Sequence, residues 1–143
     1  MNTKKSALRI IDANLNRALE GLRILEEITR FVFNDKQKTA SLKRIRHGVK
    51  KEIIELFGGT KVLLLSRNVA GDVGKEKNSP DEFKRNELRD IFEANFKRTE
   101  EALRVLEEFT KLFRQGSAQV FKKFRFKVYE IEKKLVLDFQ KKN

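Results

Sequence analysis

The sequence predicts an all-α protein, a four-helix up-down bundle built from two repeated helical hairpins. The main observation is an internal repeat with an offset of 81 residues, because DANLNRALEGLRILEEITRF at 12–31 returns as EANFKRTEEALRVLEEFTKL at 93–112. A weaker repeat follows each copy, where LKRIRHGV at 42–49 aligns with FKKFRFKV at 121–128. In the first copy, apolar residues recur at spacings of three and four, as in an amphipathic helix that packs in a bundle. The repeated unit is therefore predicted to be a helical hairpin.

Ten positions are identical between the two main copies. They pair Ala13 with Ala94, Asn14 with Asn95, Arg17 with Arg98, Glu20 with Glu101, Leu22 with Leu103, Arg23 with Arg104, Leu25 with Leu106, Glu26 with Glu107, Glu27 with Glu108 and Thr29 with Thr110. The copies also differ, as at Gly21 against Ala102 and Asn16 against Lys97. These differences indicate that the two halves have specialised.

The predicted elements follow from this pattern and from the residues that cap helices. Helices are predicted at about 7–33, from Asp35 to about 57, from Glu87 to about 114, and at about 118–139. Asp35 is expected to cap the second helix, Gly58 and Gly59 to end it, and Gly116 with Ser117 to form the turn and cap before the last helix. The chain is predicted to be one domain over 1–143, with repeat 1 at about 7–57, a connection at about 58–79 and repeat 2 at about 80–139.

The connection holds four of the seven glycines. Residues 62–65 are predicted to form a short strand or a segment pinned to the core. Residues 79–82, Ser-Pro-Asp-Glu, have the pattern of a helix start, with Asn86 as a second cap. Long connections without regular structure are often functional.

Composition predicts a soluble cytoplasmic protein. The chain has 143 residues, no cysteine, no apolar stretch near the roughly 18 residues of a membrane span, and no signal-peptide region at its N-terminus. Charged residues make up 38% of the chain, with many Lys and Glu, which is typical of proteins from hot habitats. The net charge of +12 suits nucleic acid, and equally nucleotides or phosphorylated metabolites.

Polar residues interrupt the apolar arc of both repeated helices. On a wheel of about 100° per residue, Asn14 and Arg17 fall inside the first arc, and Glu20 lies at its edge. Asn95 and Arg98 fall inside the second arc. Buried amides and guanidinium groups need partners, because leaving an amide unpaired costs about 1–3 kcal/mol.

Two interpretations of these residues are open. In the first, the asparagines bond each other or the backbone, and the arginines pair with Glu20, Glu101 or Asp12. In the second, they line a polar pocket that binds anions. An up-down bundle favours the second, because its first and third helices run parallel and would bring these residues to one end, beside the connection.

The connection also offers groups that bind phosphate. Arg67 supplies a guanidinium, Asp72 a carboxylate, and Gly71 and Gly74 flexible backbone. Backbone amides can cradle phosphate, Arg can bind it with two nitrogens, and a carboxylate can hold Mg²⁺ against it. The chain lacks a G-x-x-x-x-G-K-S/T loop and the kinase H-R-D and D-F-G motifs.

Other charged residues have structural interpretations. His47, the single histidine, is expected to pack or cap rather than catalyse. Arg46 and Arg125 recur in the weaker repeat and are equally compatible with pairing to glutamates of the main repeat and with a ligand role. Six charged residues of the main repeat lie toward the solvent side of their helices and are predicted to form ion pairs at the surface or between helices, namely Arg23, Glu26, Glu27, Arg104, Glu107 and Glu108.

DANLNRALEGLRILEE, GDVG and ANFKRTEEALRVLEE, in this order, resemble the small all-helical hydroxymethylpyrimidine-phosphate kinases, which occur alone or fused ahead of thiamine-phosphate synthase. The similarity spans roughly residues 8–137 and, without a fused barrel, corresponds to the standalone form. It implies ATP-dependent conversion of 4-amino-5-hydroxymethyl-2-methylpyrimidine phosphate into the diphosphate in thiamine biosynthesis.

On that reading, catalysis is direct phosphoryl transfer dominated by positioning and charge stabilisation. Arg17 and Arg98 are expected to clamp the acceptor phosphate or the transferred group. Arg67, with the backbone of Gly71 and Gly74, is expected to bind the phosphates of ATP.

The remaining predicted site residues hold the metal and orient the substrate. Asp72 is expected to hold Mg²⁺ with help from Glu20 or Glu101. Asn14 and Asn95 are expected to orient the aminopyrimidine edge or the phosphates.

Two other functions fit the sequence. A basic helical nucleic-acid-binding protein would explain the charge, with its Lys and Arg gathered on one outer face. Another helical-bundle enzyme, such as a mutase or lyase acting on a small polyanion, would use the same arginines without a nucleotide. The pattern leaves open whether two chains form a homodimer that shares a site.

Overall fold

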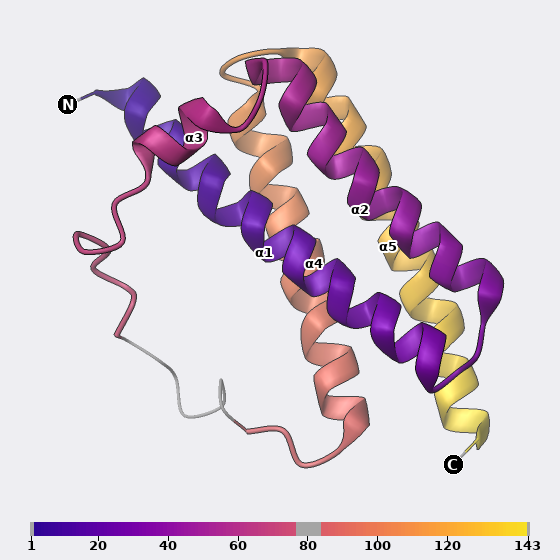
Figure 1. Ribbon diagram of the computed structural model, residues 1–143. Coiled ribbons are helices and arrows are strands. Elements are labelled where there is room, and N and C mark those ends of the chain that lie inside the picture. Colours follow the sequence, from indigo (N-terminus) through magenta and orange to yellow (C-terminus); the bar gives the residue numbers. More distant parts are fainter. Residues whose placement is uncertain (1, 77–83, 143) are drawn as a thin grey trace.

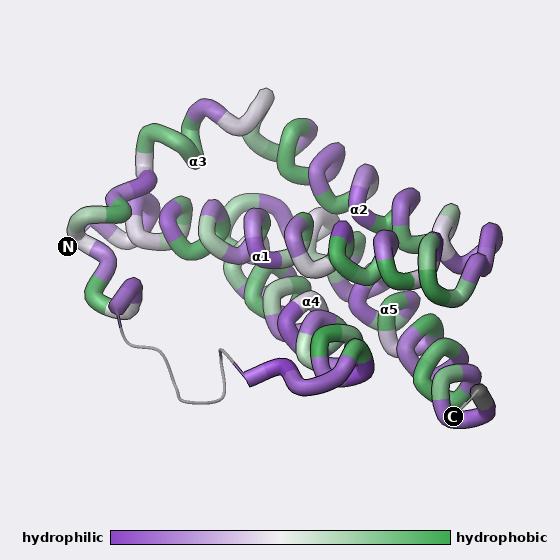
Figure 2. Tube along the Cα trace, turned by 60° about the horizontal axis from the view of Figure 1, so that its bottom comes forward, coloured by the Kyte–Doolittle hydropathy of each residue, from purple (hydrophilic) through white to green (hydrophobic). Residues whose placement is uncertain are grey.

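The computed structural model describes residues 2–76 and 84–142, and it confirms the all-α class. Within these residues the chain forms four long helices and one short helix (Figure 1). They are α1 (Thr3–Phe31), α2 (Lys36–Phe57), α3 (Lys61–Ser66), α4 (Leu88–Thr110) and α5 (Gln115–Lys142). Apolar and polar residues alternate around the long helices, so each has an apolar side that faces the core (Figure 2). None of the helices in the described ranges is long and apolar enough to cross a membrane.

The predicted ends of α2 are the observed ones. Asp35 accepts a hydrogen bond from the Lys38 amide at 2.9 Å, and Gly58 ends the helix with a φ of 73°. Glycine suits that conformation because it has no Cβ. At α4 the cap is Glu87 and not the predicted Asn86, because Asp90 accepts a hydrogen bond from the Glu87 amide at 3.1 Å. The helix start predicted at 79–82 lies outside the described residues.

One of the two alternatives for residues 62–65 is confirmed, and the second hairpin differs from the prediction. Residues 62–65 belong to the short helix α3, which is pinned to the core by Leu63, 1% exposed. The second hairpin turns earlier than predicted, because α4 ends at Thr110 and α5 already begins at Gln115. The predicted cap Ser117 therefore lies inside α5, where its hydroxyl accepts a hydrogen bond from Arg114 Nε at 3.0 Å.

Helices α1 and α4 run antiparallel, and the prediction that they run parallel was wrong. Phe33, just past the end of α1, packs against Phe92 near the start of α4, with ring centroids 5.5 Å apart. The end of α3 and the start of α4 accordingly lie at opposite ends of the bundle (Figure 1). In the view of Figure 1, α1 therefore runs downward and α2 upward, and then α4 runs upward and α5 downward.

The length of the connection permits this order. Residues 67–87 separate α3 from α4. At about 3.3 Å per residue they reach roughly 70 Å, while α4 is only about 35 Å long at about 1.5 Å per residue. The connection is long enough to return the chain to the other end of the bundle, so nothing forces the up-down order that a short loop would impose.

Helices α2 and α5 pack together on one side of the α1–α4 pair. A Cβ on Gly48 of α2 would lie 2.5 Å from the ring of Phe124 of α5, so the ring sits directly against the glycine. An ion pair joins Lys38 to Asp138 at 3.6 Å. The short helix α3 also packs against α1.

Small residues bring α1 and α4 together at the centre of the molecule. A Cβ on Gly21 would lie 2.3 Å from Thr99 Oγ1, which is closer than real Cβ contacts. The repeat equivalents of Thr99 and Gly21 are Ala18 and Ala102, which are also fully buried. We call this contact the central crossing.

A buried ion pair is repeated in the two hairpins. Arg46 of α2 donates to the Glu26 carboxylate of α1, and Arg125 of α5 donates to Glu107 of α4 at 3.1 Å. Both glutamates are buried, at 6% and 5% exposure. For Arg46 and Arg125, the structure therefore shows the pairing to repeated glutamates that the sequence left open.

We predict that Gly21→Ala destabilises the protein by about 1–2 kcal/mol, because the new methyl group overpacks the central crossing. Thr99→Ala removes the hydroxyl oxygen that the methyl would meet, and this buried oxygen has no hydrogen-bond partner in the described chain. The double variant reproduces the alanine pair of the repeat, so its stability should return to at least the wild-type value. Urea unfolding of both single variants and the double variant tests this, and a double variant as unstable as Gly21→Ala would contradict it.

Candidate functional site

The two repeated asparagines are buried and satisfied by the backbone. Asn14 Nδ2 donates to the Ile10 carbonyl at 2.9 Å, and Asn95 Nδ2 donates to the Ile91 carbonyl at 2.8 Å. Arg17 Nη1 reaches Asn14 Oδ1 at 3.4 Å. For the asparagines, the structure thus shows the backbone bonding that the sequence offered as one alternative, and their role in orienting a substrate remains a prediction.

The repeated arginines and outer glutamates lie on an exposed face at the middle of the bundle. Arg17 and Glu20 precede Gly21 by four residues and one residue, while Arg98 and Glu101 flank Thr99. All four are exposed. We call them the crossing face. Because α1 and α4 carry the same residues and cross antiparallel, each helix presents one exposed arginine and one exposed glutamate close to the central crossing.

This placement corrects the predicted pocket in two ways. The arginines do not point into the core, because each repeated helix has packed neighbours on only part of its circumference and Arg17 and Arg98 lie beyond that part. The repeated residues also do not gather at one end beside the connection, because α4 is reversed relative to the prediction. The structure nevertheless brings Arg17, Glu20, Arg98 and Glu101 near one contact.

Packing and ion pairs account for the other charged positions of the repeat. Glu26 and its copy form the buried pairs described above. Arg23 pairs with Glu27 at 3.2 Å, and the copy of this pair joins Arg104 to Glu108 at 2.9 Å. In the part of the chain that the structure describes, no ion pair involves any residue of the crossing face. The crossing face is therefore the one set of repeated charges that packing leaves unexplained among the described residues.

The predicted nucleotide-binding arginine instead joins α3 to α1. Arg67 donates from Nε and Nη2 to both oxygens of Asp12, at 2.7 and 2.9 Å. These hydrogen bonds raise the pKa of Arg67 above its ordinary value. Arg9 adds a hydrogen bond to the Asn68 carbonyl at 3.3 Å. Arg67 thus has a structural partner, and its role in binding a nucleotide remains a prediction.

The glycine-rich loop after α3 is held by its own side chains. Asn68 Oδ1 accepts from the Gly71 amide and Asp72 Oδ1 accepts from the Gly74 amide, both at 2.9 Å. The loop is exposed, and the described residues contain no group of three or more His, Cys, Asp or Glu side chains that could hold a metal. Binding of Mg²⁺ by Asp72 and Glu20 therefore remains a prediction, as does the nucleotide contact of Gly71 and Gly74.

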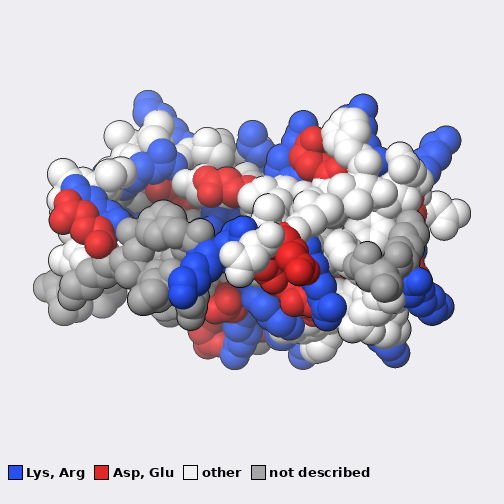
Figure 3. All heavy atoms as spheres, turned by 90° about the horizontal axis from the view of Figure 1, so that it is seen from below, with Lys and Arg blue, Asp and Glu red and all other residues white. Residues whose placement is uncertain are grey.

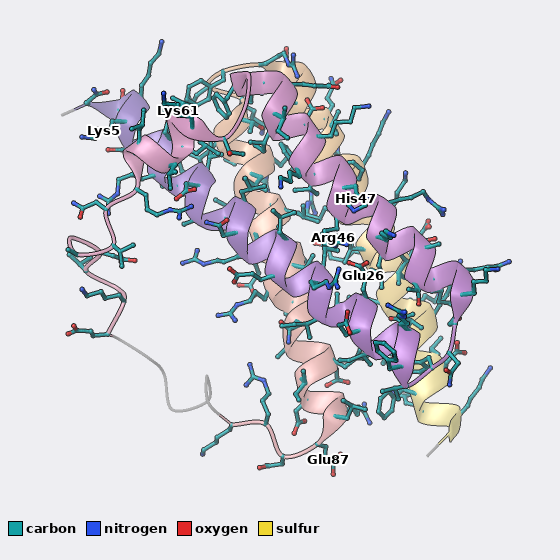
Figure 4. All side chains as sticks on the ribbon, in the orientation of Figure 1. Lys5, Glu26, Arg46, His47, Lys61 and Glu87 are labelled. Carbon is teal, nitrogen blue, oxygen red and sulfur yellow. The ribbon has the colours of Figure 1, made fainter. Side chains whose placement is uncertain are left out.

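A groove of about 560 Å³ between α1 and α2 adjoins the crossing face. Its lining residues are Leu19, Glu20, Arg23, Ile24, Arg46, His47 and Lys50. Glu20 belongs to both the groove and the crossing face, and Arg46 meets Glu26 between the two helices, with His47 beside it (Figure 4). His47 is exposed and lines the groove, so it is not the packed residue that the sequence predicted. The sequence pattern does not show this exposure of His47, because it depends on how α2 is oriented in the bundle.

A pair of carboxyl groups lies between α4 and α5, and sequence reasoning missed it. Lys97 Nζ lies 3.3 Å from Glu100 Oε1 and 3.2 Å from Glu132 Oε2. Burial raises the pKa of Glu100 to about 8, with further contributions from hydrogen bonding to Glu132 and repulsion by its charge, while Lys97 opposes the shift. At neutral pH the two carboxyl groups therefore share a proton.

Together these features define a class of protein, an all-α pair of repeated hairpins with repeated charges on an exposed central face. The chain belongs to the ThiD2 family, whose model matches residues 9–134. Similar proteins named thiamine-phosphate synthase occur in Nostoc punctiforme (43% identical over 128 residues), Gloeobacter violaceus (38% over 125) and Rhodopirellula baltica (37% over 138). The matches cover 90%, 87% and 93% of this chain and 35% of each relative, so the chain spans about a third of their length. No solved structure gives a significant match.

These relatives correct the predicted activity. The resemblance implied phosphorylation of a pyrimidine phosphate by ATP, but the relatives are named for synthesis of thiamine phosphate, which is a condensation and not a phosphoryl transfer. The prediction of a kinase is therefore wrong. A shared fold and shared motifs identify relatives without fixing the reaction, which depends on the site. The cofactors ATP and Mg²⁺ were predicted with the kinase reaction, and the structure does not test them.

The surface in Figure 3 bears on the nucleic-acid alternative. On that face, Lys and Arg side chains lie among Asp and Glu side chains and do not form one continuous basic area. Nucleic-acid-binding proteins usually gather their basic residues into a patch or stripe. This face therefore does not have the expected form of a nucleic-acid interface.

We predict that Glu100→Gln changes how stability depends on pH. In the wild type, the folded pKa of about 8 exceeds the ordinary value of 4.5, so the folded state holds a proton that the unfolded state releases. The stabilisation that this proton gives the folded state is fully present below about pH 4.5 and is lost as the pH rises toward 8. The variant has no such proton to lose.

The difference in unfolding free energy, variant minus wild type, should therefore increase between pH 5 and about pH 9, as measured by urea unfolding. Glu101→Gln makes the same substitution at a neighbouring exposed position of α4 and serves as the control for the substitution itself. A flat difference for Glu100→Gln would contradict the proton-holding pair.

Proposed function

We propose that this chain serves thiamine biosynthesis as a helical enzyme domain, and that its crossing face binds a phosphorylated substrate or product of thiamine-phosphate formation. The observation that carries the proposal is the set of four exposed, repeated charges without ion pairs, Arg17, Glu20, Arg98 and Glu101. The names of the similar proteins supply the pathway.

The charges of the crossing face suit this class of ligand. A guanidinium can bind a phosphate group with two parallel hydrogen bonds, and two arginines on neighbouring helices can hold one phosphate from both sides. The two glutamates suit amino groups or a positively charged ring. Thiamine phosphate carries both kinds of group, a phosphate and a cationic ring system with an amino substituent. The equal number of arginines and glutamates is therefore complementary to a ligand of mixed charge.

The adjoining groove gives such a ligand a place for its rings. Leu19 and Ile24 supply apolar surface there, while His47 and Lys50 add donors for a second anionic group. The volume of about 560 Å³ lies within the range of roughly 300–1,000 Å³ that is usual for small-molecule sites. A ligand anchored on the crossing face can extend into this groove through Glu20, which borders both.

The proposal also accounts for the length of the relatives. About two thirds of each synthase relative lies outside the region that matches this chain, so the helical part and the remainder are joined in one protein. We infer that the helical domain handles a phosphorylated intermediate that the remainder forms or consumes. The domain and the remainder would then act on the same small molecules.

We predict that the protein binds thiamine phosphate more tightly than thiamine, and that Arg17→Ala or Arg98→Ala removes most of this preference. Loss of one charge-assisted contact should weaken phosphate binding by about 10- to 100-fold. Isothermal titration calorimetry with the two ligands measures the preference directly.

Arg44→Ala, an exposed arginine of α2 away from the crossing face, is the matched control and should bind like the wild type. Equal affinity of the wild type for thiamine and thiamine phosphate would refute the proposal. So would unchanged phosphate preference in both crossing-face variants.

A further inference from the structure

A groove lies between α4 and α5, at the end of the bundle where α4 begins (Figure 1). Its volume is about 710 Å³. Apolar surface comes from Ala94, Val136 and Leu137 and from the ring of Tyr129, and charged side chains stand around it. The combination of apolar walls with a few polar groups is usual for sites that bind small molecules.

One member of the carboxyl pair, Glu132, lines this groove. Lys97 and Glu132 line the groove, and Glu100 lies directly behind them, bonded through Oε1 to Lys97. Glu100 is only 4% exposed, and its Oε2 has no hydrogen-bond partner in the described chain. Burying two neighbouring carboxyl groups is costly even when they share a proton, so their presence calls for an explanation beyond packing.

The internal repeat shows that the fold does not need this pair. At an offset of 81, Glu100 corresponds to Leu19, and at the offset of 79 that relates the second helices, Glu132 corresponds to Ile53. Ile53 is fully buried in the core and Leu19 packs against it. The first hairpin thus closes with two aliphatic side chains where the second has two carboxyl groups. Apolar residues are the more favourable choice for packing alone.

The same comparison shows that the equivalent of one groove position, Glu93, is covered in the first hairpin. Glu93 lines the groove, and its repeat equivalent is Asp12. Asp12 is 6% exposed, because Arg67 and the end of α3 cover it. Within the described residues, no helix equivalent to α3 covers α4 and α5. The uncovered groove and the carboxyl pair therefore coincide in the same place in one repeat.

The other carboxylates around the groove already have partners. Asp90 accepts the amide hydrogen bonds that cap α4, and Glu93 pairs with Arg89 at 2.9 Å. Lys97 is the resident cation of the remaining pair, yet its side chain is 65% exposed and its contacts of 3.2–3.4 Å are long. Strong charge-assisted hydrogen bonds measure about 2.7–2.9 Å. A cation that enters the groove can therefore replace Lys97 with better geometry.

We propose that the α4–α5 groove is a binding site for a small organic cation with a flat apolar body, whose nitrogen group binds Glu132 and Glu100 in place of Lys97. The apolar walls take the body of the ligand, and the carboxyl pair takes its charge. A planar amidinium fits best, because its two parallel N–H groups match the two oxygens of a carboxylate. This site is separate from the crossing face, so the inference does not rest on the proposed function.

Benzamidine is a suitable probe, and benzamide is its uncharged counterpart of the same shape. Isothermal titration calorimetry with the whole chain should show benzamidine binding at least tenfold tighter than benzamide. Glu132→Gln should weaken benzamidine binding by about tenfold or more, because it removes the charged acceptor. Lys97→Met should strengthen benzamidine binding, because it removes the competing cation and keeps the length of the side chain.

Glu130→Gln is the matched control, a glutamate of α5 that lies outside this groove, and it should bind benzamidine like the wild type. Thermal unfolding of each variant confirms that it is folded before the titration. Equal binding of benzamidine and benzamide would overturn the proposal. An unchanged affinity in Glu132→Gln, or no gain in Lys97→Met, would overturn it as well.

Discussion

The close contact of Gly21 with Thr99 is the constraint on which the arrangement of this protein depends. Without a side chain at Gly21, α1 and α4 approach until the glycine meets the Thr99 hydroxyl group. The two hairpins then place α2 and α5 on the same side of the pair, where a buried glutamate–arginine bond holds each hairpin together. The crossing face lies on exposed parts of α1 and α4 beside this contact. A larger separation of α1 and α4 would spread these charges apart.

Because the chain contains two copies of the same hairpin, each copy can be compared with the other. Where the halves agree, as in the buried glutamate–arginine bonds and the backbone-bonded asparagines, the shared feature serves the hairpin itself. Where they differ, one half shows what the other can do without. Leu19 and Ile53 of the first hairpin occupy the positions equivalent to Glu100 and Glu132. The carboxyl groups of the second hairpin are therefore dispensable for packing. A protein without a repeat would not offer this comparison.

Local features of the fold could be predicted, and long-range ones could not. The cap at Asp35 and the stop at Gly58 depend on a few neighbouring residues, so the sequence contains the whole of their cause. The direction of α4 depends on the path of a long connection, which no local pattern records. A parallel bundle and this antiparallel one have the same apolar stripes, and long-range contacts such as that of Phe33 with Phe92 distinguish them.

The prediction of the candidate site was also limited by its dependence on long-range packing. A helical-wheel projection places Arg17 within an arc of apolar residues. It cannot show that part of this arc has no neighbouring helix to pack against. Glu100 was missed because a glutamate near the edge of an amphipathic helix is usually solvated, and its burial becomes visible only when α5 is in place. Repetition did identify the residues of the crossing face, because it does not depend on the direction of the helices.

The antiparallel crossing also has a consequence for how such a protein can change. Two identical hairpins related by a two-fold axis would form an isologous dimer, in which every substitution appears twice. Here both hairpins belong to one chain, so a residue can be replaced on one side of the axis and kept on the other. Pairing Gly21 with Thr99, where symmetry would repeat the alanines, is such a replacement. Covalent linkage thus turns a symmetric scaffold into one with two independently adjustable halves.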